Sequence, residues 1–299
     1  MNIKVNFTRK LSKAKVVNEI VFIKNKKINN SFLNPILKSI LDNELFLDQL
    51  FIQREYKNTN YIFVNCKKLT MSTDYENIGS KLFDYLKKNK IDNSFIDISK
   101  IDITHIQLEN VIHGAKLKSY NFNIYKSNDK KNKNINLNVV GKQLIKSNIL
   151  RKKLDALLEG VFFTRDLVSE PGNILHPDEY AKRLLKLKKI GLRVTVYNEK
   201  KLKKLGCNAL LGVGQGSIRG SYLVTIEWKG NKSKSKPLAF VGKGVCFDTG
   251  GISLKPARFM EDMTYDMAGS AVVVGLMKNF ALRKAKINAV GVVGLVENM

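Results

Sequence analysis

The sequence is poor in the residues that mark secreted, membrane-spanning and thiolate-metal proteins. Its 299 residues include three cysteines, five prolines and one tryptophan. The cysteines stand far apart and in no metal-binding spacing, which indicates a reducing, cytoplasmic compartment. No apolar run approaches the roughly 18–20 residues that span a bilayer, and the first residues carry charge without the apolar core of a secretory signal. We therefore predict a cytoplasmic protein with no membrane partner.

Acidic residues are also scarce. The 26 Asp and Glu residues stand against 52 Lys and Arg residues, which gives a formal net charge of +26. A charge of this size suits a nucleic-acid partner. Direct reading of bases, however, favours clustered arginine and aromatic side chains, whereas here lysine is spread along the whole chain. The composition therefore predicts nonspecific, salt-sensitive binding to polyanions.

The sequence does contain a regular alternation of strand and helix patterns. Hydrophobic residues make up 44% and charged residues 26% of the chain, which is typical of a globular protein, and the length suffices for two domains. We predict an α/β N-terminal domain at 1–140, a connecting helix at 141–168 and a second α/β domain at 169–299. The connecting helix is predicted from an apolar stripe that includes Leu150 and Leu154.

Short segments rich in β-branched and aromatic residues predict the strands, at 3–7, 19–24, 61–65, 135–140, 193–197, 221–228, 237–241 and 287–296. Helical spacing of apolar residues predicts helices at 78–90, 108–117, 199–205 and 269–283, and another that starts at Pro177. Apolar runs of this kind suit a central sheet that helices cover on both faces.

The strongest chemical signal is the segment VGKGVCFDTGGISLKPARFMEDMTYDM. It places Lys243, Asp248, Lys255 and Asp266 after a strand that is predicted to end at Gly242. The carboxyl ends of strands are where α/β folds collect their sites. Two carboxylates can bind hard divalent cations, and a lysine joins them as a ligand where a nearby dication lowers its pKa. On spacing alone, a structural cluster of ion pairs is the alternative.

Longer blocks of the chain are similar to one peptidase family. VGKGVCFDTGGISLKP and the following MTYDMAGS resemble the catalytic domain of the cytosolic leucyl aminopeptidase family, and RDLVSEPGNILHP and LGCNALLGVGQGS agree with it. The similarity extends from about residue 60 to the last residue of the sequence. It implies an N-terminal macro-like α/β domain and a mixed-sheet α/β/α metallopeptidase domain.

The resemblance also implies a role for each site residue. Lys243 would ligate one metal ion through its amine, Asp248 would bridge two ions, and Asp266 would complete one shell. Lys255 would polarise the peptide carbonyl and stabilise the oxyanion, and Met263 would line the pocket for the N-terminal side chain. The implied cofactors are two divalent ions, manganese or zinc, and the implied substrates are peptides with a leucine-like N-terminal residue. The family forms hexamers in the cytoplasm.

One motif of the family, NTDAEGR, has no counterpart in this sequence. It would supply an Asp, a bridging Glu and an Arg, so Asp248 and Asp266 are half of the expected carboxylate cage. We therefore expect a C-terminally truncated catalytic domain, little or no activity from the chain alone, and an uncovered apolar strand at 287–296. Three alternatives stay open: a non-functional gene fragment, one half of a split enzyme, or a basic DNA-binding accessory protein.

Overall fold

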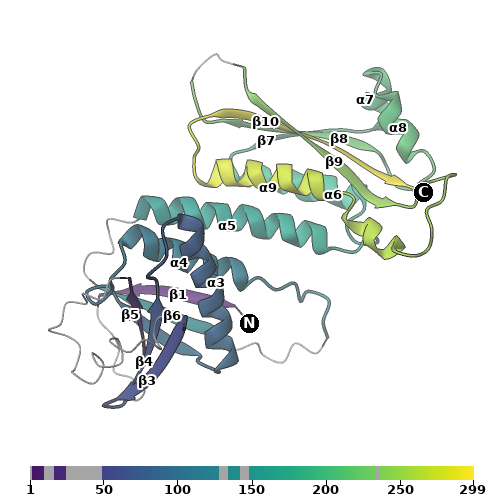
Figure 1. Cartoon of the computed structure of the whole chain (residues 1–299). Helices are drawn as coiled ribbons and strands as arrows, with labels where there is room; N and C mark the ends of the chain where they lie inside the picture. The colour runs from purple at the N-terminus through teal and green to yellow at the C-terminus, as the bar shows by residue number, and fades with distance from the viewer. Residues whose placement is uncertain (1, 10–16, 25–48, 128–133, 142–147, 233–235) are drawn as a thin grey trace. The chain divides into compact units, whose positions relative to one another are not determined.

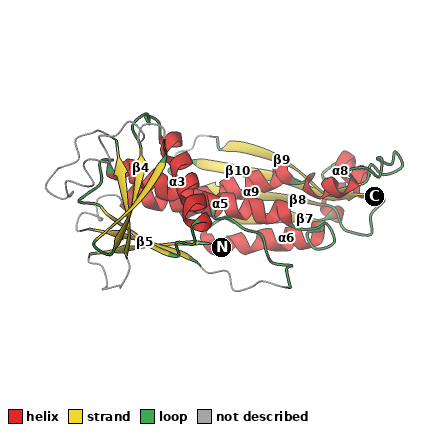
Figure 2. Ribbon diagram, turned by 60° about the horizontal axis from the view of Figure 1, so that its bottom comes forward, coloured by secondary structure: helices red, strands yellow, loops and turns green. Residues whose placement is uncertain are grey.

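The computed structural model describes residues 2–9, 17–24, 49–127, 134–141, 148–232 and 236–299. The chain divides into two compact units, residues 1–152 and 153–299. Each unit holds one mixed sheet and its own helices (Figures 1 and 2), which confirms the predicted α/β class. Among the helices that the structure describes, none combines the length and the apolar character that a bilayer span requires.

The first unit is built on a six-stranded sheet with the order β1-β6-β5-β2-β4-β3. Only the edge strand β3 runs antiparallel to its neighbour; the other pairs are parallel. The described elements are β1 (Ile3–Thr8), β2 (Val17–Ile23), β3 (Phe51–Tyr56), β4 (Thr59–Asn65), α3 (Ser72–Lys88), β5 (Asn93–Asp97), α4 (His105–Lys118) and β6 (Ile135–Val140).

Helices α3 and α4 form where the sequence predicts helical spacing. In α3 the predicted apolar face, with Ile78, Leu82 and Leu86, is buried in the core of the unit. A capping box starts α4: the Gln107 amide donates to the Thr104 hydroxyl at 3.2 Å, and the Thr104 amide donates to the Gln107 side chain at 2.8 Å. Both helices begin earlier than predicted, α3 at Ser72 and α4 at His105.

The second unit is built on a four-stranded sheet with the order β7-β8-β10-β9. Strand β8 runs antiparallel to both neighbours, and β9 and β10 are parallel. Helix α5 (Asn148–Ser169) begins in the last residues of the first unit and continues into the second. The other elements of the second unit are α6 (Pro177–Leu185), the 3-10 helix η1 (Lys186–Ile190), β7 (Arg193–Tyr197), α7 (Glu199–Lys204), α8 (Asn208–Gly214), β8 (Tyr222–Lys229), β9 (Leu238–Asp248), the 3-10 helix η2 (Met260–Tyr265), α9 (Ala268–Leu282) and β10 (Asn288–Asn298).

Helix α9 connects the parallel strands β9 and β10, and with α6 it covers one face of the sheet (Figure 1). The prediction that the strand at 287–296 would lie uncovered is wrong. Strand β10 lies between β8 and β9, and Ala289, Val293 and Leu295 are buried. The edge strands of the described sheet are β7 and β9, and Val241 in β9 is 80% exposed.

Strands β3 and β5, helix α8 and the 3-10 helices η1 and η2 escaped the sequence prediction. Both strands are short, and their apolar residues Phe51-Ile52 and Phe95-Ile96 stand next to each other instead of alternating with polar ones, so the strand signal is weak. Helix α5 starts at Asn148, within the range predicted for a connecting helix, and residues 142–147 of that range lie outside the described residues.

Candidate active site

Strand β9 carries the first two site residues. The sequence predicts that the strand ends at Gly242, but it continues to Asp248, so Lys243 lies within the strand and only Asp248 lies at its carboxyl end. The glycine there has a packing role. A Cβ at Gly242 would stand 2.6 Å from the Cα of Ser270, so glycine lets the first turn of α9 approach the strand.

The two lysines and two aspartates that the sequence singled out form one ion-pair cluster. Lys243 Nζ lies 2.7 Å from Asp266 Oδ2, and Lys255 Nζ lies 2.9 Å from Asp248 Oδ2. Lys255 is also 4.0 Å from Asp266 Oδ2, so that carboxylate oxygen is near both ammonium groups. The structure thus gathers residues from β9, from the loop that follows it and from the end of η2 into one site.

Asp248 is the least exposed member of the cluster, with 14% of its side chain accessible. Burial alone would raise its pKa, but hydrogen bonds from Lys255, Asn298 and the Gly250 amide outweigh this and hold the pKa of Asp248 well below its usual range. The carboxylate is therefore ionised throughout the physiological range, which is the form that binds a cation.

Asp266 stands at the positive end of a helix. Helix α9 begins two residues later, at Ala268, and the positive end of a helix dipole favours a carboxylate. A buried pair of hydroxyls fixes this helix start. Ser270 donates to the Met267 carbonyl at 2.7 Å, so the Tyr180 hydroxyl, 3.0 Å from the Ser270 oxygen, is the donor of the second bond. Helix α6 thereby anchors the turn beside Asp266.

Met263 lies in η2, and its sulfur accepts a hydrogen bond from Lys255 Nζ at 3.0 Å. The residue expected to line the substrate pocket is thus in contact with the residue expected to polarise the carbonyl. Two further residues near these elements have structural roles. Cys246 is buried, and burial raises the pKa of its thiol. The His176 side chain caps the N-terminus of α6.

Sequence reasoning missed Asn298. This residue ends β10, and its side-chain amide donates to Asp248 Oδ1 at 2.8 Å. A signal for it exists in the sequence, because the carboxyl ends of neighbouring parallel strands meet at the same edge of a sheet. The missed extension of β9 to Asp248 hid this relation.

The cluster is chemically suited to a divalent cation. Its donors are the carboxylates of Asp248 and Asp266, and hard cations prefer carboxylate oxygen. Lys243 would add an amine ligand once its ammonium group loses a proton. Two ammonium groups already lie against these oxygens, so the site favours positive charge. No group of three or more His, Cys, Asp or Glu side chains placed to hold a metal occurs in the described ranges, and this site offers two such carboxylates.

Comparisons with known proteins agree with the resemblance noted above. Residues 162–299 match the catalytic domain of the cytosol aminopeptidase family. A "Probable cytosol aminopeptidase" of Phytoplasma mali is 47% identical over 226 residues, which cover 74% of this chain and 45% of that protein. Its namesake in Caulobacter vibrioides is 52% identical over 190 residues, which cover 62% of this chain and 38% of that protein. The chain spans less than half the length of these curated relatives.

The fold is also that of a solved structure. The bottromycin maturation enzyme BotP, in a complex with Mn, superposes with a TM-score of 0.74 and 21% identity, over 94% of this chain and 60% of that one. At this identity the likeness supports the fold alone. The sequence matches, by contrast, confirm the recognition made from the motifs: this chain is a member of the cytosol aminopeptidase family, and residues 162–299 belong to its catalytic domain.

Proposed function

We propose that this chain carries part of the active site of a metal-dependent aminopeptidase that releases leucine-like N-terminal residues from peptides. One observation carries the proposal: each lysine nitrogen of the cluster lies within 4.0 Å of an aspartate oxygen of the cluster. The cluster consists of Lys243, Asp248, Lys255 and Asp266. A plain structural ion-pair cluster would give the same distances, but family membership favours the catalytic interpretation. The cytoplasmic location and the hexameric assembly that the family implies are part of the same proposal.

Each residue has a role that its position allows. Asp248 and Asp266 would hold the cations through their carboxylates, with the Lys243 amine as a further ligand. Two divalent ions, manganese or zinc, would supply Lewis acidity and an activated water, as in other two-metal hydrolases. Lys255 has a different role, because its ammonium group is available to a carbonyl oxygen that becomes negative in the transition state. Met263 would place the apolar N-terminal side chain beside that group.

The number of metal ligands in the cluster predicts how strongly the 299-residue chain alone binds metal and hydrolyses a substrate. Two carboxylates and one amine are fewer protein ligands than two hard cations usually take. We therefore expect weak uptake of metal and little or no hydrolysis of a leucine amide by the purified chain. Complementation by a second polypeptide, as in a split enzyme, would raise both, whereas a non-functional fragment would show neither at any partner concentration.

A titration with Mn²⁺ tests the proposed site directly. Calorimetry or the electron paramagnetic resonance of free Mn²⁺ would measure uptake by the wild-type chain, by Asp248→Asn and by Asp266→Asn. Asp262→Asn is the matched control, since Asp262 lies in η2 and outside the cluster. We expect at least about a tenfold loss of affinity in the two site variants and none in the control. Equal uptake by wild type and Asp248→Asn would refute the metal site.

A further inference from the structure

Strand β10 brings one more side chain to the site through an irregularity in its pairing with β9. Val296 is level with Val245, but Asn298 is level with Asp248. Between these pairs β9 advances three residues and β10 advances two, so β9 carries one extra residue, as in a β-bulge. In regular register Asn298 would be level with Phe247. The shift is therefore what aligns Asn298 with the carboxylate.

Asn298 forms hydrogen bonds with the turn at Asp248 through both its backbone and its side chain. Its backbone carbonyl accepts hydrogen bonds from the Thr249 amide at 2.8 Å and from the Thr249 hydroxyl at 2.9 Å. Its side-chain amide donates to Asp248 Oδ1 at 2.8 Å. The backbone contacts join the ends of the two strands and do not depend on the nature of the side chain. The side-chain contact acts on the carboxylate alone.

The two oxygens of Asp248 are consequently divided between different partners. Oδ1 accepts from Asn298 and, at 3.0 Å, from the Gly250 amide, whereas Oδ2 faces the Lys255 ammonium at 2.9 Å. An ionised carboxylate can only accept, so the NH₂ group of Asn298 must be the side that faces it. With Oδ1 held twice, the carboxylate cannot rotate freely, and Oδ2 stays directed toward the centre of the cluster.

We infer that Asn298 is a positioning residue for Asp248: its amide fixes the orientation in which that carboxylate presents Oδ2 to a cation. The inference rests on the proposed function, in which Asp248 is a metal ligand. Partners that orient a ligand in this way typically change metal affinity by about 10–100-fold when they are lost. Asn298 would act on the reaction only through Asp248, without contact to substrate.

The test uses two amide protons in the metal-free chain. The Gly250 amide donates to the Asp248 carboxylate, and the Thr249 amide donates to the Asn298 backbone. Hydrogen exchange at both amides would be measured by NMR in wild type, Asn298→Ala and Asn298→Asp. Asn288→Ala, at the opposite end of β10, is the matched control. The aspartate variant keeps the shape of the side chain, but its ionised carboxylate cannot donate a hydrogen bond. It therefore distinguishes the effect of losing the hydrogen bond from the effect of losing side-chain volume.

We expect faster exchange at Gly250 in both Asn298 variants, with exchange at Thr249 and the control unchanged. A merely structural role would accelerate both amides, and that result, or an unchanged Gly250, would overturn the inference. If wild type takes up Mn²⁺ as proposed, Asn298→Ala should weaken the affinity about tenfold, and an unaltered affinity would also overturn it. Failure of wild type to bind Mn²⁺ would refute the proposed function, and the two amides would still decide the role of Asn298.

Discussion

At the scale of single residues, Tyr222 shows how one hydroxyl changes the response of the fold to pH. It begins β8, and its hydroxyl donates to Asp178 Oδ1, in the first turn of α6, at 2.7 Å. Burial, and then the hydrogen bond and the charge of Asp178, raise the pKa of Tyr222 to about 12. The folded protein thus holds this phenol protonated at pH values at which a free tyrosine is ionised.

This shift predicts a loss of stability in alkali. The folded-state pKa of about 12 lies above the ordinary value, which is about 10. Between these values the unfolded chain has released the proton and the folded chain has kept it, so the unfolded state is favoured as the pH rises. Tyr222→Phe should make the fall in unfolding free energy from pH 10 to 12 shallower, as measured by urea titration. Tyr197→Phe is the control, and slopes that stay parallel to wild type in both variants would contradict the assignment.

At the scale of elements, the apolar periods of the sequence predict where helices and strands lie, but they do not predict register. The strand at 193–197 and the helix start at Pro177 are confirmed. The predicted end of β9 at Gly242 lies six residues before its actual end at Asp248, because Gly242 and Gly244 look like a strand exit. Their actual role is close packing against α9 and β10, which depends on tertiary contacts that no local pattern contains. The charged residues of the site were predictable from their motif. For Asn298 only a place near the end of a strand was predictable, because its alignment with Asp248 depends on the β-bulge.

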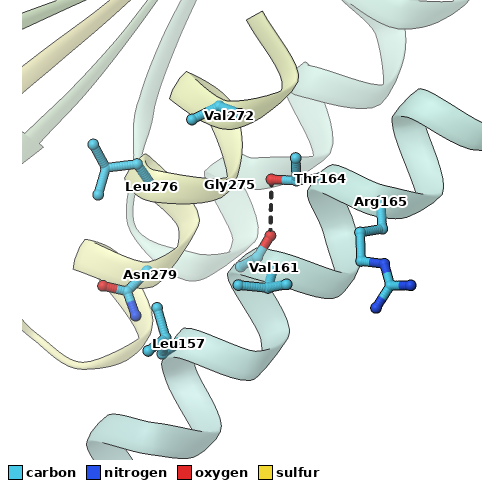
Figure 3. Close-up of a pocket in the computed structure, with 9 residues that line it drawn as sticks. Leu157, Val161, Thr164, Arg165, Val272, Gly275, Leu276 and Asn279 are labelled. Carbon is cyan, nitrogen blue, oxygen red and sulfur yellow. Dashed lines mark hydrogen bonds between the residues drawn. The ribbon is translucent and has the colours of Figure 1, made fainter. Parts of the chain in front are cut away.

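The packing of α5 against α9 depends on small residues rather than on the leucine stripe that predicted α5. Gly160 and Gly275 meet at the crossing, where the Thr164 hydroxyl contacts the carbonyls of Gly160 at 3.1 Å and Ala271 at 3.0 Å. Figure 3 shows Thr164 beside Gly275 on the facing helix. A cavity of about 260 Å³ lies beside this crossing, and the Leu157 side chain at its rim is 43% exposed. The helices therefore approach by backbone contact, and an added methyl group has no space.

Gly275→Ala should accordingly destabilise the second unit. A Cβ at this position would stand 2.1 Å from Thr164 Oγ1 and 2.6 Å from the Gly160 carbonyl oxygen. Overpacking of this kind lowers the free energy of unfolding by about 1–3 kcal/mol. The midpoint of urea or thermal unfolding should fall accordingly. Gly212→Ala is the control, because Gly212 lies in α8 and a Cβ added there would meet no described atom within 4 Å. There the gain in helix propensity should stabilise slightly, so an equal response of the two variants would show that packing is not the cause.

At the scale of the whole molecule, the acidic oxygens of the site attract cations, whereas the net positive charge of the chain repels them. The cluster requires acidic oxygens to gather cations, yet the chain carries a formal charge of +26. Long-range repulsion between the protein and a dication is screened within about 8 Å at physiological ionic strength. The carboxylates of Asp248 and Asp266 therefore act on a cation at short range, and the net charge acts mainly on large polyanions.

This division predicts salt-dependent, sequence-independent binding of nucleic acid. The affinity of the chain for a random-sequence duplex should fall at least about tenfold between 50 and 200 mM NaCl, because each neutralised phosphate releases bound counterions. Fluorescence anisotropy with two duplexes of unrelated sequence would measure it, and equal slopes for both would assign the binding to charge alone. Asp248→Asn and Asp266→Asn should leave the slope unchanged, since neither removes a cationic side chain. A strong preference for one duplex that survives high salt would instead support the DNA-binding accessory role over the nonspecific one.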